Sequence, residues 1–335
     1  MTTMRTRRLG ATGPTVSALG LGCMGMSDMY GAADRAESLA TFQAAVDAGI
    51  TLIDTGDFYG MGHNEMLIGE ALKRVDRDKV LLSVKTGALR DPSGAFLGYD
   101  SRPAALKNFL AHSLKRLGVD HIDIYRPSRL DPTVPIEDSI GAIAEMVKAG
   151  WVRHIGLSEV GSETIRRAAA VHPIADLQIE YSIIARGIED SVLKTTRELG
   201  IGITAYGVLA RGLIGGHFGK DSFQAGLDIR RFSPRFVGEN LDHNLGVAAT
   251  LGRLGAEKGA TTAQLAIAWV AARGDDIVPL IGARRRDRLS EALGALDVAL
   301  TAEDLAAIEA AIPRDAARGD RYPTPMMAHL DSERG

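Results

Sequence analysis

Short apolar runs alternate with longer amphipathic segments along this 335-residue chain. Eight of the runs have the length and composition of buried strands. They are residues 18–21, 51–54, 80–85, 121–125, 152–157, 176–180, 202–206 and 277–281. Most recur at a spacing of about 25 to 40 residues, the length of one strand–helix unit. Eight such units that close on one another predict an α/β fold, a (β/α)8 TIM barrel.

The segments between the runs are predicted to be helices. Alanine and leucine recur at helical spacing in residues 35–48, 103–117 and 136–149. Several of the segments end at a glycine, which a helix C-cap prefers: Gly49, Gly118, Gly150 and Gly200. The gap before the eighth run is the longest. We expect it to hold a polar loop over residues 215–240 and an extra helix from about residue 244 to residue 258.

Two further elements are expected outside the barrel. Leu9–Val16 is predicted to form an N-terminal β-hairpin that closes the barrel bottom. Residues 300–312 are predicted to form an extra C-terminal helix, because Thr301 precedes it and Asp304 follows three residues later, close to a capping box.

No linker divides the chain, so we expect one domain over residues 1–335. Residues 9–312 would be the barrel with its accessory elements, and residues 313–335 a C-terminal tail. The last part of that tail, from Gly319, contains proline and methionine. It is expected either to be mobile or to fold over the active-site mouth.

Composition excludes several classes of function. A net charge of −3 gives no support for nucleic acid or an anionic membrane as a partner. The single cysteine, Cys23, excludes an internal disulfide and a cysteine-only zinc cluster, and no metal site is expected. The N-terminus lacks the apolar region of a secretory signal, and no apolar stretch approaches about 18 residues. A cytoplasmic location is therefore expected, whereas the oligomeric state stays open.

Three polar residues follow the ends of neighbouring predicted strands. Asp54 ends the second run, Lys85 ends the third, and Tyr59 lies five residues after Asp54. Alone, Asp54 is equally explained as a turn cap and Lys85 as a solvated strand end. In a barrel, however, all strand C-termini converge on one face. Since a phenol loses its proton near pH 10 in water, one that works at neutral pH needs a nearby cation, and a carboxylate can hold that cation in place.

The stretch Asp54–Gly60 (DTGDFYG), followed by Asn64 and Glu65, resembles the signature of the aldo-keto reductase family. The resemblance extends from about Leu9 to Ile312, and Met24 within GLGCMG is similar to the bacterial and plant branch. It implies an NAD(P)H-dependent barrel enzyme that reduces an aldehyde or ketone to the alcohol, reversibly. It also implies a catalytic tetrad of Asp, Tyr, Lys and His.

The resemblance assigns a role to each member of the tetrad. Tyr59 would protonate the carbonyl oxygen, Lys85 would lower the pKa of Tyr59, and Asp54 would pair with the lysine. The family's histidine falls at Ser128, in the run IDIYRPSRLDP. Serine offers one hydroxyl but does not titrate near pH 7. Ser128 is therefore expected either to bind a water or the substrate oxygen or to fill space.

The resemblance also implies a set of cofactor contacts. They are Gly22, Met24, Asp54, Ser158, Gln178, Tyr206, Gly207, Leu209, Arg211, Gly212, Gly282, Arg284, Arg288 and Glu291. Ser158 and Gln178 would hold the nicotinamide amide and Tyr206 would stack on its ring, whereas the neighbouring family asparagine is replaced by Glu159. Gly20, Gly22 and Gly25 also match the Rossmann fingerprint, but no helix pattern follows them directly. Those glycines are better explained by backbone approach to the nicotinamide.

Two segments are expected to bind the phosphates. The segment Gly207–Gly216 resembles the family's pyrophosphate clamp, in which Arg211 supplies the charge. After the last strand a tight turn leads into a helix N-terminus, which favours anions. Arginines at positions 284, 285, 286 and 288 there predict binding of a 2′-phosphate, and hence NADPH, unless they form a solvated basic face.

The sequence therefore predicts a reductase acting on a small carbonyl or alcohol, with two alternatives. One is a barrel that binds NADPH as a sensor, and the other is an enone double-bond reductase. The pocket walls are expected from Tyr30, Phe58, Arg90, Arg126 and the loop over residues 215–240.

Overall fold

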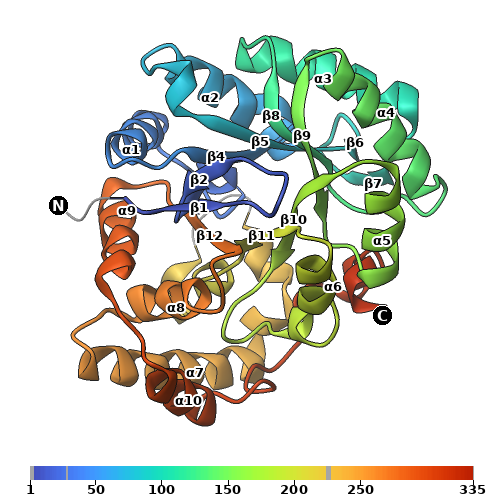
Figure 1. Ribbon diagram of the computed structural model, residues 1–335. Coiled ribbons are helices and arrows are strands. Elements are labelled where there is room, and N and C mark those ends of the chain that lie inside the picture. The colour runs from blue at the N-terminus through green and yellow to red at the C-terminus, as the bar shows by residue number, and fades with distance from the viewer. Residues whose placement is uncertain (1–3, 28, 224–227, 335) are drawn as a thin grey trace.

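The computed structural model describes residues 4–27, 29–223 and 228–334. Eight parallel strands close into a barrel in the order β10, β11, β12, β3, β4, β5, β8, β9 (Figure 1). These strands are β3 (Gly20–Gly22), β4 (Leu52–Gly56), β5 (Leu81–Thr86), β8 (Ile122–Pro127), β9 (Val152–Ser158), β10 (Ile174–Glu180), β11 (Gly202–Tyr206) and β12 (Ile277–Gly282). The predicted TIM barrel is confirmed, and each strand overlaps its predicted run.

Helices surround the barrel, as Figure 1 shows. They are α1 (Arg35–Asp47), α2 (His63–Leu72), α3 (Pro103–Leu117), α4 (Ile136–Lys148), α5 (Ser162–Val171), α6 (Val192–Glu198), α8 (Thr262–Ala271) and α9 (Arg286–Leu293). Two additional helices are α7 (Gly238–Glu257) and α10 (Ala302–Ala311). Helix α7 begins six residues before the predicted start at residue 244. Helix α10 begins with the expected reciprocal bonds between Thr301 and Asp304, at 3.0 and 3.2 Å.

An antiparallel hairpin of β1 (Thr6–Arg8) and β2 (Thr15–Ser17) closes the barrel bottom. The predicted span therefore begins too late, since it covers the connecting turn and β2 but leaves out β1. Leu9 and Val16 are fully buried in a cluster with Ile124 and Val278 from the barrel interior. The plug at the barrel bottom is thus an apolar contact between the hairpin and inward-facing strand residues.

The barrel interior above this plug is polar. Arg126, predicted to line the pocket, is instead 0% exposed and forms an ion pair with Asp176 at 3.0 Å. The correction follows from strand alternation, because residues two apart on a strand point to the same face. Ile124 and Arg126 therefore both point inward. A side chain at Gly156 would collide with both members of this pair, at 2.7 and 2.8 Å, so the glycine makes room for it.

The C-terminal strand ends form the barrel mouth, where the connecting segments are longest. A second hairpin of β6 (Ala88–Arg90) and β7 (Phe96–Tyr99) follows β5. The tail continues past α10 through α11 (Thr324–Met327). No helix within the described ranges is long and apolar enough to cross a membrane.

Candidate functional site

Asp54, Lys85 and Gln178 form a closed hydrogen-bonded ring inside the mouth. Lys85 Nζ lies 2.5 Å from Asp54 Oδ2 and 2.7 Å from Gln178 Oε1, and Gln178 Nε2 donates to Asp54 Oδ1 at 2.7 Å. The side chains of Asp54 and Lys85 are 5% and 6% exposed. Ser83 Oγ also donates to Asp54 Oδ1, at 2.9 Å. Strands β4, β5 and β10 therefore bring together two residues of the predicted catalytic set and one of the predicted cofactor set.

Tyr59 lies beside this ring, on a 3-10 turn (Tyr59–Gly62) that follows β4. Lys85 Nζ is 5.2 Å from the centroid of the Tyr59 ring. Burial, followed by the charge of Asp54, raises the pKa of Tyr59 well above its ordinary value. Burial and the Asp54 charge outweigh the lowering expected from Lys85, whose ammonium is itself paired with Asp54 at 2.5 Å. Tyr59 is therefore a protonated phenol at neutral pH.

Two serine hydroxyls in the mouth are buried and have no hydrogen-bond partner among the described residues. They belong to Ser128, directly after β8, and Ser158, the last residue of β9. Both residues are 2% exposed. A buried hydroxyl without a partner is costly, so both positions are suited to bind a polar group that is absent from the protein chain itself.

The backbone near the mouth is open or strained at several predicted cofactor positions. A side chain at Gly282 would meet no other atom within 4 Å, and one at Gly22 would meet only the Ile281 carbonyl at 3.7 Å. After β11, Gly207 and Gly212 have φ values of 67° and 94°, and Arg211 has a φ of 58°. Turns in which successive backbone N–H groups converge form concave backbone that suits anions. This site fits an extended, phosphate-bearing cofactor.

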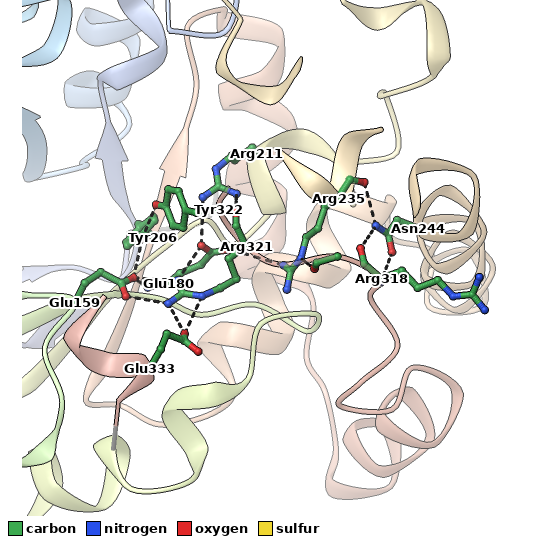
Figure 2. Close-up of polar contacts among 11 residues, drawn as sticks. Glu159, Glu180, Tyr206, Arg211, Arg235, Asn244, Arg318, Arg321, Tyr322 and Glu333 are labelled. Carbon is green, nitrogen blue, oxygen red and sulfur yellow. Dashed lines mark hydrogen bonds and ion pairs between the residues drawn. The ribbon is translucent and has the colours of Figure 1, made fainter. Parts of the chain in front are cut away.

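A second charged cluster holds the C-terminal tail over the mouth. Arg321 donates to Glu159 at 3.0 Å and to Glu180 at 3.0 Å, and Figure 2 shows it between these two carboxylates. Glu159 and Glu180 are 0% and 3% exposed. We call these three residues the tail latch. Farther along the tail, Asn244 of α7 exchanges two hydrogen bonds, both 2.9 Å, with the Arg318 backbone (Figure 2).

Glu159, at the position where the resemblance led us to expect an asparagine, belongs to the tail latch. It has a left-handed backbone (φ 52°), and its carboxylate accepts bonds from Arg321, Tyr206 and Ser332. Burial alone would raise the pKa of Glu159, but the Arg321 cation holds that pKa well below its usual range. The carboxylate is ionised and committed to the tail.

The latch brings Tyr322 into the mouth. The Tyr322 hydroxyl lies 2.9 Å from the Tyr206 hydroxyl, and its ring lies 4.3 Å below the Arg211 guanidinium (Figure 2). Arg211 also donates to the Arg321 carbonyl at 2.8 Å and pairs with Glu180 at 3.4 Å. The predicted pyrophosphate cation thus contacts the tail, and its phosphate role stays a prediction. Of the two outcomes expected for the tail, folding over the mouth is the one found.

Replacing Arg321 with methionine is expected to release the tail. The change leaves the buried Glu159 without its cation and leaves Glu180 with the longer contacts to Arg211 at 3.4 Å and Arg235 at 3.9 Å. Breaking a buried pair typically costs about 3–5 kcal/mol. Chymotrypsin should then cleave within residues 319–334 about tenfold faster or more, measured by mass spectrometry under native conditions. The matched control is Arg314→Met, because that tail arginine pairs with Asp190 on the surface, with side chains 45% and 66% exposed. Equal cleavage of both variants would contradict the latch.

The predicted 2′-phosphate cluster follows β12. Arg285 pairs with Asp287 at 2.6 Å and Arg286 with Glu37 at 2.8 Å, as expected for the solvated alternative. Glu37 also accepts from the Arg286 backbone N–H at 2.9 Å, which occupies part of the α9 N-terminus. Arg288 lies 3.2 Å from Glu291.

Sequence reasoning missed the tail latch, Tyr322 and Arg129. Arg321 is separated from Glu159 and Glu180 by 162 and 141 positions. No local motif connects residues so far apart. The one available signal was Glu159 itself, a charged residue where the family has an amide. No group of three or more histidine, cysteine or acidic residues in the described part of the chain is arranged to hold a metal ion.

Comparison with known proteins gives consistent matches. The model of the aldo/keto reductase family matches residues 18–313. A relative described as probable aldo-keto reductase 1 from Glycine max is 39% identical over 316 residues, covering 94% of this chain and 91% of the relative. A glycerol dehydrogenase from Gluconobacter oxydans has a similar structure, with a TM-score of 0.84, 28% identity, and coverage of 96% of this chain and 98% of its own. A thermostable aldo-keto reductase in complex with the inhibitor epalrestat has a TM-score of 0.74 and 28% identity, over 92% of this chain and 100% of its own.

Proposed function

Because the chain belongs to the aldo/keto reductase family, whose members are oxidoreductases acting on carbonyl groups, we propose that it reduces an aldehyde or ketone with NADPH and with Tyr59 as proton donor. The observation that carries the proposal is the buried ring of Asp54, Lys85 and Gln178 beside a protonated phenol. General acid catalysis needs such a group within reach of the reacting oxygen.

The cofactor supplies the hydride, and the residues of the site handle the proton. As the carbonyl carbon gains hydride, its oxygen gains negative charge and takes the proton of the Tyr59 hydroxyl. The phenolate that remains is stabilised by the Lys85 ammonium, 5.2 Å from the ring centroid. Asp54 and Gln178 keep that ammonium in place.

The remaining predicted contacts are proposed as follows. Ser158 and Gln178 would bind the nicotinamide amide, and Tyr206 would stack on the ring. The other cofactor contacts would come from residues of the mouth and its loops: Gly22, Met24, Gly207, Leu209, Arg211, Gly212 and Gly282. The buried Ser128 hydroxyl has no partner within the described chain. The unpaired hydroxyl supports a role for Ser128 as a hydrogen-bond donor to the carbonyl oxygen. Ser128 occupies the position where the resemblance predicts a histidine.

A simple assay separates this proposal from a sensor role. Purified protein is mixed with NADPH and an aromatic aldehyde, and both cofactor consumption and alcohol formation are followed. Turnover supports the reductase. Tight NADPH binding without turnover of any carbonyl in a broad panel would favour the sensor instead.

The preference for NADPH is proposed from the cations beyond β12, and Arg288 tests it. Arg288→Ala is expected to raise KM for NADPH by about 10- to 100-fold, since it removes a charge-assisted contact to the 2′-phosphate, and to leave KM for NADH unchanged. Arg285→Ala is the matched control, because its guanidinium pairs with Asp287 at 2.6 Å, more closely than Arg288 pairs with Glu291 at 3.2 Å. Equal effects of Arg288→Ala on both cofactors would contradict the assignment. Arg284 and Glu291 are proposed as further contacts of the adenosine end.

A further inference from the structure

Arg129 is an arginine of the mouth that sequence reasoning did not single out. It follows Ser128 on the loop that leaves β8. Its guanidinium donates to the Ser128 carbonyl at 2.6 Å and lies 3.5 Å from the Tyr322 hydroxyl. It therefore lies between the end of β8 and the tail.

Arg129 differs from Lys85, Arg211 and Arg321 in having no direct ion pair, although Tyr206, Tyr322 and the Glu159 carboxylate raise its pKa against the effect of burial. Lys85 pairs with Asp54, Arg211 with Glu180, and Arg321 with both latch carboxylates. Arg129 forms no ion pair with any carboxylate of the described chain. Its side chain is only partly exposed, so water compensates its charge incompletely. A guanidinium has five donors in a planar fork, and two hydrogen bonds leave most of them available.

The charge of Arg129 reaches the reacting group. Burial raises the pKa of Tyr59, and Arg129 is the cation that acts in the opposite direction. The same cation acts on Tyr99 and Tyr206, which places it among the phenols that surround the mouth. The backbone agrees, because the N–H of the preceding residue, Ser128, donates to the Thr86 carbonyl beside Lys85 at 2.8 Å. A group bound to Arg129 would thus lie near a carbonyl positioned at Tyr59.

We infer that Arg129 recognises an anionic group on the substrate, a carboxylate or a phosphate, and so selects negatively charged carbonyl compounds. This inference rests on the proposed function and names the substrate class of the same site. The planar fork of arginine matches both anions bidentately. Tyr322 helps to hold the guanidinium toward the mouth, so the tail contributes to recognition only indirectly.

The test compares charged and neutral aldehydes of nearly equal shape. The probes are para-carboxybenzaldehyde, its methyl ester and para-formylphenyl phosphate. In wild type the two anions are expected to have a higher kcat/KM than the ester. The anion with the larger gain in kcat/KM over the ester shows whether the site prefers a carboxylate or a phosphate. In Arg129→Gln the kcat/KM of the preferred anion should fall by about 10- to 100-fold, and that of the ester by less than about threefold.

Two variants complete the comparison. Arg129→Lys keeps the charge without the fork, so part of the preference should remain. Arg102→Gln is the matched control, because this arginine is 72% exposed and pairs with Asp100 at 2.6 Å, and it should change neither rate. The inference is overturned if the ratio of kcat/KM for the anion to kcat/KM for the ester is the same in Arg129→Gln as in wild type, whether both values fall or neither does.

A binding readout separates the two proposals. If wild type reduces none of the aldehydes, the proposed function fails, and calorimetric titration with para-(hydroxymethyl)benzoate still tests Arg129. Wild type is expected to bind this anion about tenfold more tightly or better than Arg129→Gln. Equal binding by the two proteins would overturn the anion site whatever the catalytic result.

Discussion

Replacing Tyr59 with phenylalanine is expected to lower kcat for aldehyde reduction by about 10²- to 10⁴-fold, the usual contribution of a general acid. The change removes one hydroxyl and keeps the ring, which packs edge-on against Phe58 at 4.9 Å. Cofactor affinity should stay within about threefold of wild type, because the hydroxyl serves the proton step. Steady-state kinetics and fluorescence titration with NADPH measure the two effects.

Tyr125→Phe is the matched control for this result. Its hydroxyl is also buried and donates to the Leu106 carbonyl at 3.2 Å, outside the ring of Asp54, Lys85 and Gln178. Loss of that bond should cost about 1 kcal/mol of stability and leave kcat unchanged. If Tyr59→Phe keeps more than about a third of the wild-type kcat, the phenol is not the proton donor.

Replacing Arg126 with methionine is expected to lower the free energy of unfolding by about 3–5 kcal/mol. The variant leaves the Asp176 carboxyl buried without its cation, whereas Arg126 and Asp176 are both 0% exposed in the native barrel. Burial already raises the pKa of Asp176, and Arg126 opposes that rise. Without Arg126 the carboxyl must either take up a proton or remain charged in the closed barrel interior without a cation. Urea unfolding followed by circular dichroism measures the loss.

Two comparisons show whether the loss comes from the unpaired charge. In the double variant Arg126→Met with Asp176→Leu, most of the stability should return, since apolar replacement of a buried pair is often neutral or stabilising. Arg167→Met breaks a surface pair with Glu137, with side chains 46% and 41% exposed, and should cost less than about 1 kcal/mol. A loss in Arg126→Met no larger than in Arg167→Met would contradict the role of the buried pair.

The barrel and the central residues could be predicted because they depend on local patterns. Strand length and helical periodicity indicate eight units, and closure of those units brings all strand ends to one face. Asp54 and Lys85 lie on different strands, yet their positions at strand ends were enough to place them together, whereas Gln178 was placed through the resemblance to the family. The resemblance to the family supplied their expected roles.

The rest of the site depends on contacts that no local pattern encodes. Arg126 was wrongly assigned to the pocket wall, whereas strand alternation points it inward to Asp176. Arg321 reaches back across 162 positions to Glu159, so only the folded chain shows what that carboxylate does. The pKa of Tyr59 was misjudged for a related reason. The charge of Lys85 was counted, but the burial of the phenol, which is the largest cause of the rise in its pKa, was not.

Transfer of a deuterium label tests the central claim most directly, namely that this site passes hydride to a carbonyl carbon. NADPH labelled with deuterium at the transferable position of nicotinamide carbon four is mixed with wild-type protein and an unsaturated aromatic aldehyde, and the product is analysed by NMR. The account predicts one deuterium on the carbinol carbon, with the adjacent double bond intact. Deuterium on an alkene carbon, or bound NADPH that transfers no label to any product, would contradict it.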